Sequence, residues 1–152
     1  MGSMYRLQVA ASLEHLSDIR DFVRAVGSGA GMDADSLAET LLAVDEAATN
    51  IVMHGYSKCS GSIIVEVEST TEALIARLRD AAEPFDPCCV PAPDLDVPLE
   101  RRRPGGLGIH LMRQFVDEIH HRVIGERGNE LTLVKKFRTP LEGLQERGVY
   151  GH

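Results

Sequence analysis

The chain has 152 residues and a hydrophobic content of 43%, which is enough apolar material for one domain with its own core. Sixteen lysines and arginines against 23 aspartates and glutamates leave a formal charge of -7, which argues against nucleic acid or an anionic membrane surface as the main partner. The three cysteines suit a reducing compartment, and no segment reaches the roughly 18 apolar residues that cross a membrane, so we expect a cytoplasmic protein.

The N-terminal part of the sequence predicts a strand and then a helix. Tyr5, Leu7 and Val9 alternate with polar or small residues, which is the period of a half-buried strand. Residues 12–31 follow with apolar side chains at helical spacing and end in a glycine-rich stop.

A longer helix is predicted over residues 33–57, with Asp33 or Asp35 as the N-cap and Gly55 as the stop. Its expected apolar stripe consists of Leu37, Leu41, Val44, Ala48, Ile51 and Val52. Glu46 and Asn50 are four residues apart, so they lie one above the other on a different face of this helix.

A hairpin follows, with strands over 61–70 and 73–80 joined by a short polar turn. Asp80 falls at the end of the second strand. Residues 81–104 contain six of the seven prolines and show no periodicity. A loop of this length in a compact domain is either functional or disordered, and we expect it to form a lid.

The remaining pattern is a helix over 106–119 and two strands over 119–127 and 130–138, joined by a Gly-Asn turn. One domain is therefore expected over residues 4–138, followed by a polar tail at 139–152. The order of elements predicts an α/β two-layer sandwich, with a mixed, mainly antiparallel sheet and helices on one face.

Several residues of this pattern are suited to chemistry. A carboxylate such as Glu46 can polarise a nucleophile, and a carboxamide oxygen such as that of Asn50 can hold a hard cation. The same spacing also fits an ordinary pair on a solvated helix face. Asp80 can accept a hydrogen bond from the exocyclic amine of a purine, or it can start a turn. Phe85 can pack under a ligand or into the core.

A glycine cluster, Gly105, Gly106 and Gly108, precedes the last predicted helix. Glycines there let backbone N–H groups face an anion, and the helix dipole adds partial positive charge. The basic run 101–103 can add charge to such a site, although a short basic run is more often solvated. Taken alone, the cluster fits a plain turn as well as a phosphate site.

Three segments, "DEAATNIVMHGY", "DAAEPFDP" and "GGLGIHL", together resemble the nucleotide-binding boxes of the GHKL ATPase superfamily. The resemblance is specifically to bacterial anti-sigma factor serine/threonine kinases of the partner-switching type, and it extends from about Tyr5 to Arg138. It implies a histidine-kinase-like ATPase fold, ATP and Mg²⁺ as cofactors, and a homodimer.

By this resemblance Glu46 is the catalytic base, Asn50 the magnesium ligand and Asp80 the adenine-binding acid. The glycines hold the phosphates beneath the lid. The residues that the resemblance places at the nucleotide are Asn50, Asp80, Ala82, Phe85, Arg103, Gly105, Gly106, Leu107 and Gly108.

The function implied is phosphoryl transfer from Mg-ATP to a serine or threonine of an anti-sigma factor antagonist, by a protein that also sequesters a sigma factor. No direct contact with nucleic acid or membrane is implied. A histidine-kinase ATPase domain split from its dimerisation helices is a weaker alternative, because no phosphoacceptor helix precedes the fold.

Two positions depart from the family pattern. Ala82 stands where the second box usually has glycine, and alanine is strained if that position requires positive φ. Asn129-Glu130 replaces the family's Gly-Thr dipeptide, although Asn129 can serve the turn. Ala82 favours the alternative of a non-catalytic nucleotide-binding or purely protein-binding module that sequesters a partner.

Overall fold

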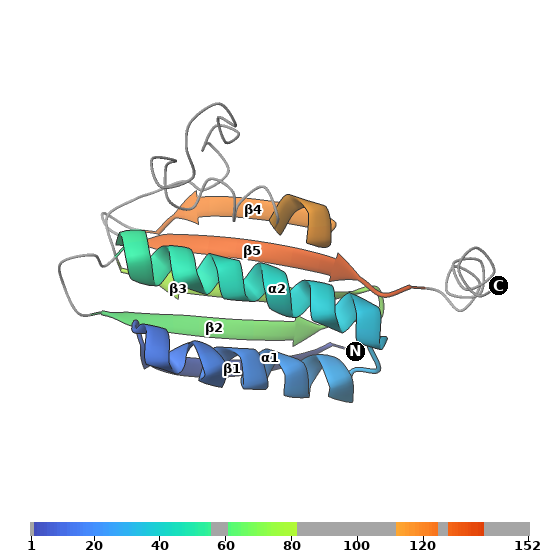
Figure 1. Cartoon of the computed structure of the whole chain (residues 1–152). Coiled ribbons are helices and arrows are strands. Elements are labelled where there is room, and N and C mark those ends of the chain that lie inside the picture. Colours follow the sequence, from blue (N-terminus) through green and yellow to red (C-terminus); the bar gives the residue numbers. More distant parts are fainter. Residues whose placement is uncertain (1, 56–60, 82–111, 125–127, 139–152) are drawn as a thin grey trace, which may run out of the picture.

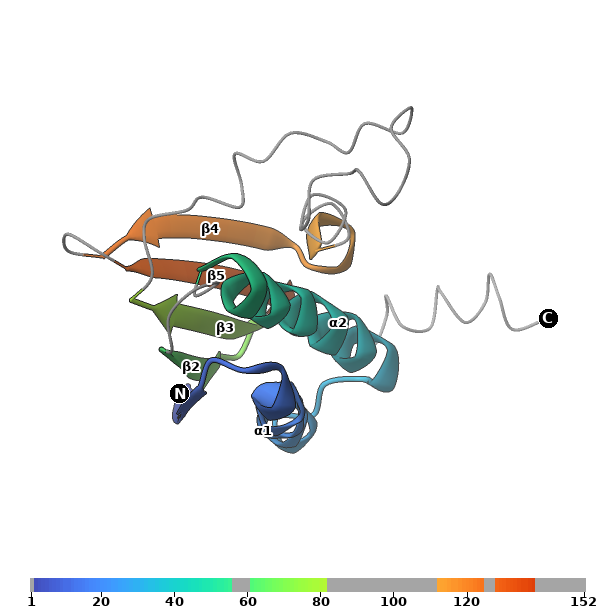
Figure 2. The same ribbon diagram turned by 60° about the vertical axis from the view of Figure 1, so that its left-hand side comes forward.

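The computed structural model describes residues 2–55, 61–81, 112–124 and 128–138. They form two layers, a five-stranded sheet and a pair of helices that covers one of its faces (Figure 1, Figure 2). The strands are β1 (Ser3–Ala10), β2 (Ser62–Ser69), β3 (Ala73–Asp80), β4 (Glu118–Val123) and β5 (Asn129–Lys136). The helices are α1 (Leu16–Gly29), after a 3-10 turn at Leu13–His15, and α2 (Ala34–Asn50), which continues into a π-helical turn at Ile51–Gly55.

The strands lie in the order β1-β2-β3-β5-β4, and every neighbouring pair is antiparallel. The predicted two-layer sandwich with a mainly antiparallel sheet and helices on one face is thus confirmed, and the described strands contain no parallel pair. Because β5 inserts between β3 and β4, the end of β3 lies beside the beginning of β5. None of the helices in the described ranges is long and apolar enough to cross a membrane.

Side chains alternate between the two faces of the sheet, as the period of a strand requires. The side chains of β2 and β3 that lie buried beneath the helices are Ile63, Val65, Val67, Leu74, Ala76 and Leu78. Glu66 and Glu68 of β2 and Arg77 and Arg79 of β3 alternate with them and lie on the opposite face. The core therefore lies between the sheet and the helices, and the outer face of the sheet carries charged groups.

Helix α2 begins as the sequence predicts. Asp33 is the N-cap, and its side chain accepts a hydrogen bond from the backbone N–H of Ser36 at 2.9 Å. This cap also lowers the pKa of Asp33, against the opposing effect of burial. The choice between Asp33 and Asp35 is thereby settled in favour of Asp33.

The predicted stripe of α2 does pack on the core, with Val44 and Ala48 buried and Ile51 and Val52 partly buried, but the buried face is wider than predicted. Leu37 and Leu41 are only partly buried, and the fully buried side chains are Ser36, Thr40, Ala43, Val44, Ala47, Ala48 and Asn50. Small side chains let the helix axis approach the sheet closely. The hydroxyl of Thr40 tolerates burial because it donates to the carbonyl of Ser36 at 2.8 Å. Apolar periodicity alone could not predict a buried stripe of small and hydroxyl side chains.

The predicted helix over 106–119 ends earlier than expected. Within the described residues it is helical over 112–115, and the chain enters β4 at Glu118. Asp117 explains the change, because its N–H donates to Val134 O at 2.9 Å and its side chain accepts from Lys136 N at 2.7 Å. Pairing with β5 thus replaces the helical hydrogen bonds from this point.

Lys135 links the two layers. It lies on the helix-facing side of β5 with a side chain only 11% exposed, and its Nζ donates to Glu39 Oε2 of α2 and to Phe115 O, both at 2.5 Å. A charge this deeply placed is stable only with such partners. One ammonium group therefore joins β5, α2 and the helical turn at 112–115.

We predict that Lys135→Met lowers the free energy of unfolding by about 2 kcal/mol, because the change keeps the side-chain volume but leaves Glu39 and the Phe115 carbonyl without this donor. Urea denaturation followed by circular dichroism measures the loss. The matched control is Lys136→Met at the exposed neighbouring position, which should change stability by less than about 0.5 kcal/mol. Equal stability of the two variants would contradict the role given to Lys135.

Candidate functional site

The side chains that the sequence marks as functional converge on one end of the two layers. Helix α2 ends at Asn50 and β3 ends at Asp80, and both ends lie at the same side of the molecule as the beginning of β5 (Figure 1, Figure 2). Asp80 pairs directly with Asn129 in the β3–β5 ladder. Residues from three separate parts of the chain are thus gathered at this end.

Asn50 is buried, with 6% of its surface exposed. Its Nδ2 has no hydrogen-bond partner among the described residues. A buried polar group without a partner costs free energy, so such a group is rare in a structural position and common at a ligand site. The π-helical turn at Ile51–Gly55 follows immediately, and π turns often occur at functional sites. The alternative of a solvated surface position does not hold for Asn50.

Glu46 lies one helical turn before Asn50 and is half-buried. Burial raises the pKa of its carboxyl, and the neighbouring Asp45 raises it further. Asp45 is itself held by α1, because Arg20 Nη2 donates to its Oδ1 at 3.0 Å. A carboxylate with a raised pKa is a stronger base, which suits a group that removes a proton.

Glu39, Glu46 and Asn50 are spaced seven and four residues apart, so they lie along one face of α2. The contact from Lys135 to Glu39 shows that this face is turned toward β5 and the helical turn at 112–115. That turn follows the glycine motif directly in the sequence. The face that bears Glu46 and Asn50 is therefore directed toward β5 and the helical turn at 112–115.

Asp80 belongs to a chain of side-chain hydrogen bonds that the sequence did not predict. Asn129 Nδ2 donates to Asp80 Oδ1 at 3.1 Å, and His121 Nε2 of β4 lies 2.9 Å from Asn129 Oδ1. Since Asn129 directs its amide group at Asp80, its oxygen is the acceptor toward His121, and His121 carries the proton on Nε2. Three adjacent strands thus contribute to fixing the carboxylate.

Gly128 makes this arrangement sterically feasible. It has φ of +128°, and a Cβ added there would lie 2.9 Å from Asp80 O and 3.3 Å from Ile124 O. The prediction that Asn129 serves the turn is wrong, because Asn129 is the first residue of β5 and pairs with Val123 of β4. A glycine directly before a predicted strand was the sequence signal for a close backbone approach at Gly128. The hydrogen bond from Asn129 to Asp80, 49 residues away, could not be predicted from the sequence.

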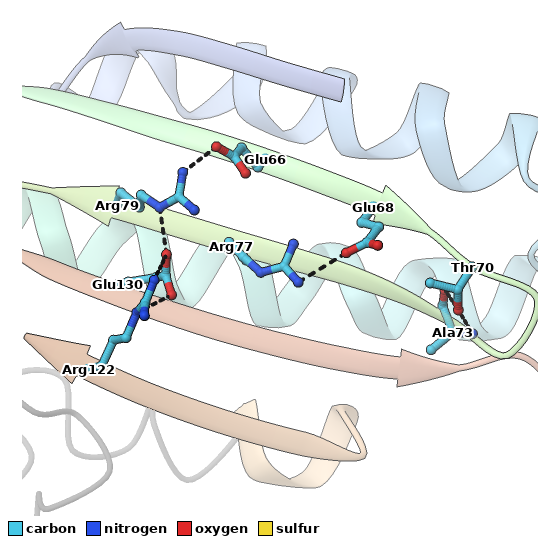
Figure 3. A network of polar contacts seen from close by, with 8 residues as sticks. All are labelled: Glu66, Glu68, Thr70, Ala73, Arg77, Arg79, Arg122 and Glu130. Carbon is cyan, nitrogen blue, oxygen red and sulfur yellow. Dashed lines mark hydrogen bonds and ion pairs between the residues drawn. The ribbon is translucent and has the colours of Figure 1, made fainter. Parts of the chain in front are cut away.

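A network of ion pairs on the outer face of the sheet stabilises the pairing register of β3 and β5 (Figure 3). Arg79, next to Asp80, bonds to Glu66 of β2 and to Glu130 of β5, the latter at 2.6 Å. Arg122 of β4 donates to Glu130 at 2.8 Å. Burial acts to raise the pKa of Glu130, but the hydrogen bonds from these two arginines outweigh it and hold the pKa below its ordinary value. Four strands are therefore cross-linked directly behind the Asp80–Asn129 pair.

The other predicted contacts lie outside the described residues. They are Ala82, Phe85, Arg103, Gly105, Gly106, Leu107 and Gly108, together with the lid beyond Ala81 and the tail at 139–152. Within the described ranges, no group of three or more histidine, cysteine, aspartate or glutamate side chains is placed to hold a metal ion. Asn50 remains the described candidate for a magnesium ligand.

Comparison with known proteins agrees with the fold and with this arrangement of elements. The sequence matches the histidine kinase-like ATPase domain over residues 9–135. The serine-protein kinase RsbW of Staphylococcus aureus, in strains JH9 and Newman, is 30% identical over an aligned length of 138 residues, and the match covers 87% of this chain and 86% of the relative.

Among solved structures, the RsbU and RsbW domains of a Mycobacterium tuberculosis protein superimpose with a TM-score of 0.64 at 19% identity. The match covers 91% of this chain and 33% of that longer chain, and at this identity it shows the fold alone. The family match and the 30% identical relatives show more, and the chain belongs to the histidine kinase-like ATPase domain family, in its partner-switching serine-protein kinase branch.

Proposed function

We propose that this protein is an anti-sigma factor serine/threonine kinase that binds Mg-ATP, sequesters a sigma factor and phosphorylates an anti-sigma factor antagonist. One observation carries the proposal. Glu46, with a raised pKa, and the buried carboxamide of Asn50 lie one turn apart on α2, at the same end of the sheet as Asp80. A base, a candidate metal ligand and a candidate purine acceptor are thus brought to one end.

Asp80 is the residue proposed to recognise the base. Its carboxylate can accept a hydrogen bond from the exocyclic amine of adenine, and the bond from Asn129 Nδ2 already holds it in place. A carboxylate held before the ligand arrives loses less conformational entropy on binding. The antiparallel register of β3 and β5 and the ion pair behind it maintain this orientation.

Asn50 is proposed to hold magnesium. Magnesium in nucleotide sites commonly takes only one or two ligands from the protein, with phosphate oxygens and water completing the shell. The fit rests on the burial of Asn50 at the end of α2. Its Oδ1 can coordinate the metal, and its Nδ2, a donor without a partner among the described residues, can donate to an oxygen of the phosphate or water shell. When bound, magnesium neutralises charge on the transferring phosphoryl group.

Glu46 is proposed to accept the proton of the attacking serine or threonine hydroxyl at its carboxylate. Partial burial makes the carboxylate more basic, and Asp45 adds to this effect. The ion pair between Arg20 and Asp45 ties this part of α2 to α1, so the base is held on a rigid element. Positioning of this kind supplies much of the catalysis in phosphoryl transfer.

The remaining parts of the proposal rest on the family resemblance. They are nucleotide contacts from Ala82, Phe85, Arg103 and the glycine motif, a lid over 81–104, one domain over 4–138 and a homodimer.

The second candidate function is that of a non-catalytic module that sequesters a partner. The methyl group of Ala82, at a place where the family usually has glycine, favours that second function.

We predict that Asn50→Ala weakens Mg-ATP binding about tenfold or more and metal-free ATP about twofold, because the lost oxygen contacts the metal rather than the nucleotide. Calorimetry with magnesium and with a chelator separates the two. Thr49→Ala is the matched control, since Thr49 Oγ1 donates to Asp45 O within the helix. An equal loss for Asn50→Ala with and without metal would argue against a magnesium ligand.

We predict that Glu46→Gln lowers phosphate transfer to a co-purified antagonist by about 100-fold or more, while ATP and partner affinities stay within about twofold.

The same variant should melt at a higher temperature at neutral pH. The raised pKa means that the folded state holds the Glu46 proton more tightly than the unfolded state, so stability falls as the pH rises through the folded pKa. Removing the charge removes that loss.

The gain in melting temperature should shrink toward about pH 4, where Glu46 approaches protonation in both states. Glu14→Gln, at an exposed position, is the control for both measurements and should leave transfer unchanged. If wild type and Glu46→Gln are equally inactive toward every candidate antagonist while partner binding persists, the kinase is excluded and the binding module remains.

A further inference from the structure

His121 is the third member of the hydrogen-bond chain at the end of the sheet, and the kinase proposal gives it no role. It is half-buried on the helix-facing side of β4, pairs with Leu131 in the ladder, and lies diagonal to Asn129. Its Nε2 is 2.9 Å from Asn129 Oδ1, and Asn129 is 7% exposed. The next residue toward the N-terminus, His120, lies on the outer face, where it contacts Glu118 at 3.0 Å.

The carboxamide of Asn129 is chemically ambivalent, because one end donates hydrogen bonds and the other accepts them. With its amide group toward Asp80, it supports a carboxylate. Rotated or flipped, the same group would present an oxygen to that carboxylate, or would release its amide to another acceptor. The carboxylate of Asp80 only accepts, so it takes the amide of Asn129, and the Nε2–H of His121 then donates to the remaining oxygen and stabilises this rotamer.

Purine bases differ at the group that a carboxylate would meet. A 6-aminopurine presents an N–H donor there, and a 6-oxopurine presents an oxygen that repels a carboxylate. An amide N–H, in contrast, can donate to that oxygen. A site in which Asn129 is free to turn can therefore accept both classes, whereas a site in which it is held against Asp80 favours the aminopurine.

We infer that His121 and Asn129 are positioning residues that set the purine selectivity of this site, His121 by fixing the Asn129 carboxamide and Asn129 by orienting the Asp80 carboxylate. The inference rests on the proposed function in one respect, that Asp80 meets the base. The ligand class selected is a 6-aminopurine nucleoside triphosphate over its 6-oxo counterpart.

The test compares the affinities of ATP and inosine triphosphate, which carries oxygen in place of the 6-amino group. Both are titrated into the full chain by calorimetry with magnesium present. Wild type should prefer ATP, and His121→Leu should lower the ratio of the two affinities by about five- to tenfold, the size expected for one hydrogen bond. Inosine triphosphate should bind the variant as well as, or better than, it binds wild type.

Three further variants separate positioning from a general structural effect. His121→Gln keeps an N–H donor beside an acceptor and should keep more of the wild-type ratio than His121→Leu does. His120→Leu on the outer face should retain the wild-type ratio within about twofold. Asn129→Leu removes both hydrogen bonds at nearly constant volume and should lose the preference at least as far as His121→Leu. Because it does not depend on the folding of His121→Leu, it keeps the test decisive if that variant is unstable.

A structural role alone would weaken both nucleotides equally and leave the ratio unchanged. The inference is overturned if His121→Leu and Asn129→Leu bind both nucleotides with the wild-type ratio. If wild type prefers ATP and Asp80→Asn loses that preference in the same experiment, the proposed function survives this failure. If wild type binds neither nucleotide, the proposed function fails, and the inference fails with it.

Discussion

The antiparallel register of β3 and β5 determines which side chains meet at the end of the sheet. It places Asp80 opposite Asn129 and Arg79 opposite Glu130. On one face the pairing makes a hydrogen-bonded carboxylate, and on the other it makes an ion pair that resists slippage. A shift by one residue would exchange the two faces and move the carboxylate away from α2. Gly128 permits the register, because any side chain there would collide with the end of β3.

The second constraint is the fixed position of α2 relative to this sheet. Small buried side chains bring the helix close to the strands, and Lys135 ties Glu39 to β5 at 2.5 Å. Glu46 and Asn50 lie further along the face that Lys135 contacts, so their positions are set by packing at a distance from the site. Arg20 adds a tie from α1 at Asp45. A half-buried base and a buried carboxamide are thus held on a rigid helix, which suits a site where positioning matters most.

Much of this arrangement could be predicted from local patterns in the sequence. Period-two alternation predicted the hairpin that ends at Asp80, and the cap at Asp33 and the spacing of Glu46 and Asn50 fixed the geometry of α2. Long-range pairing could not be predicted in this way. Nothing local shows that His121 and Asn129 lie beside Asp80, or that Asp117 ends a helix by pairing with β5. The burial of Asn50 could not be predicted from the sequence either, because polar residues are expected on exposed faces.

The central claim is that Mg-ATP binds where the C-terminal end of α2 meets the end of β3 and the beginning of β5. Backbone amide NMR on the full chain tests this claim most directly. Titration with Mg-ATP should shift the amides of Asn50, Asp80, Gly128 and Asn129 along one saturable curve. The amide chemical shifts of Glu68 and Arg77, whose side chains lie on the outer face of the sheet, should stay unchanged. No saturable shift up to millimolar nucleotide, or shifts confined to the outer face, would contradict the account.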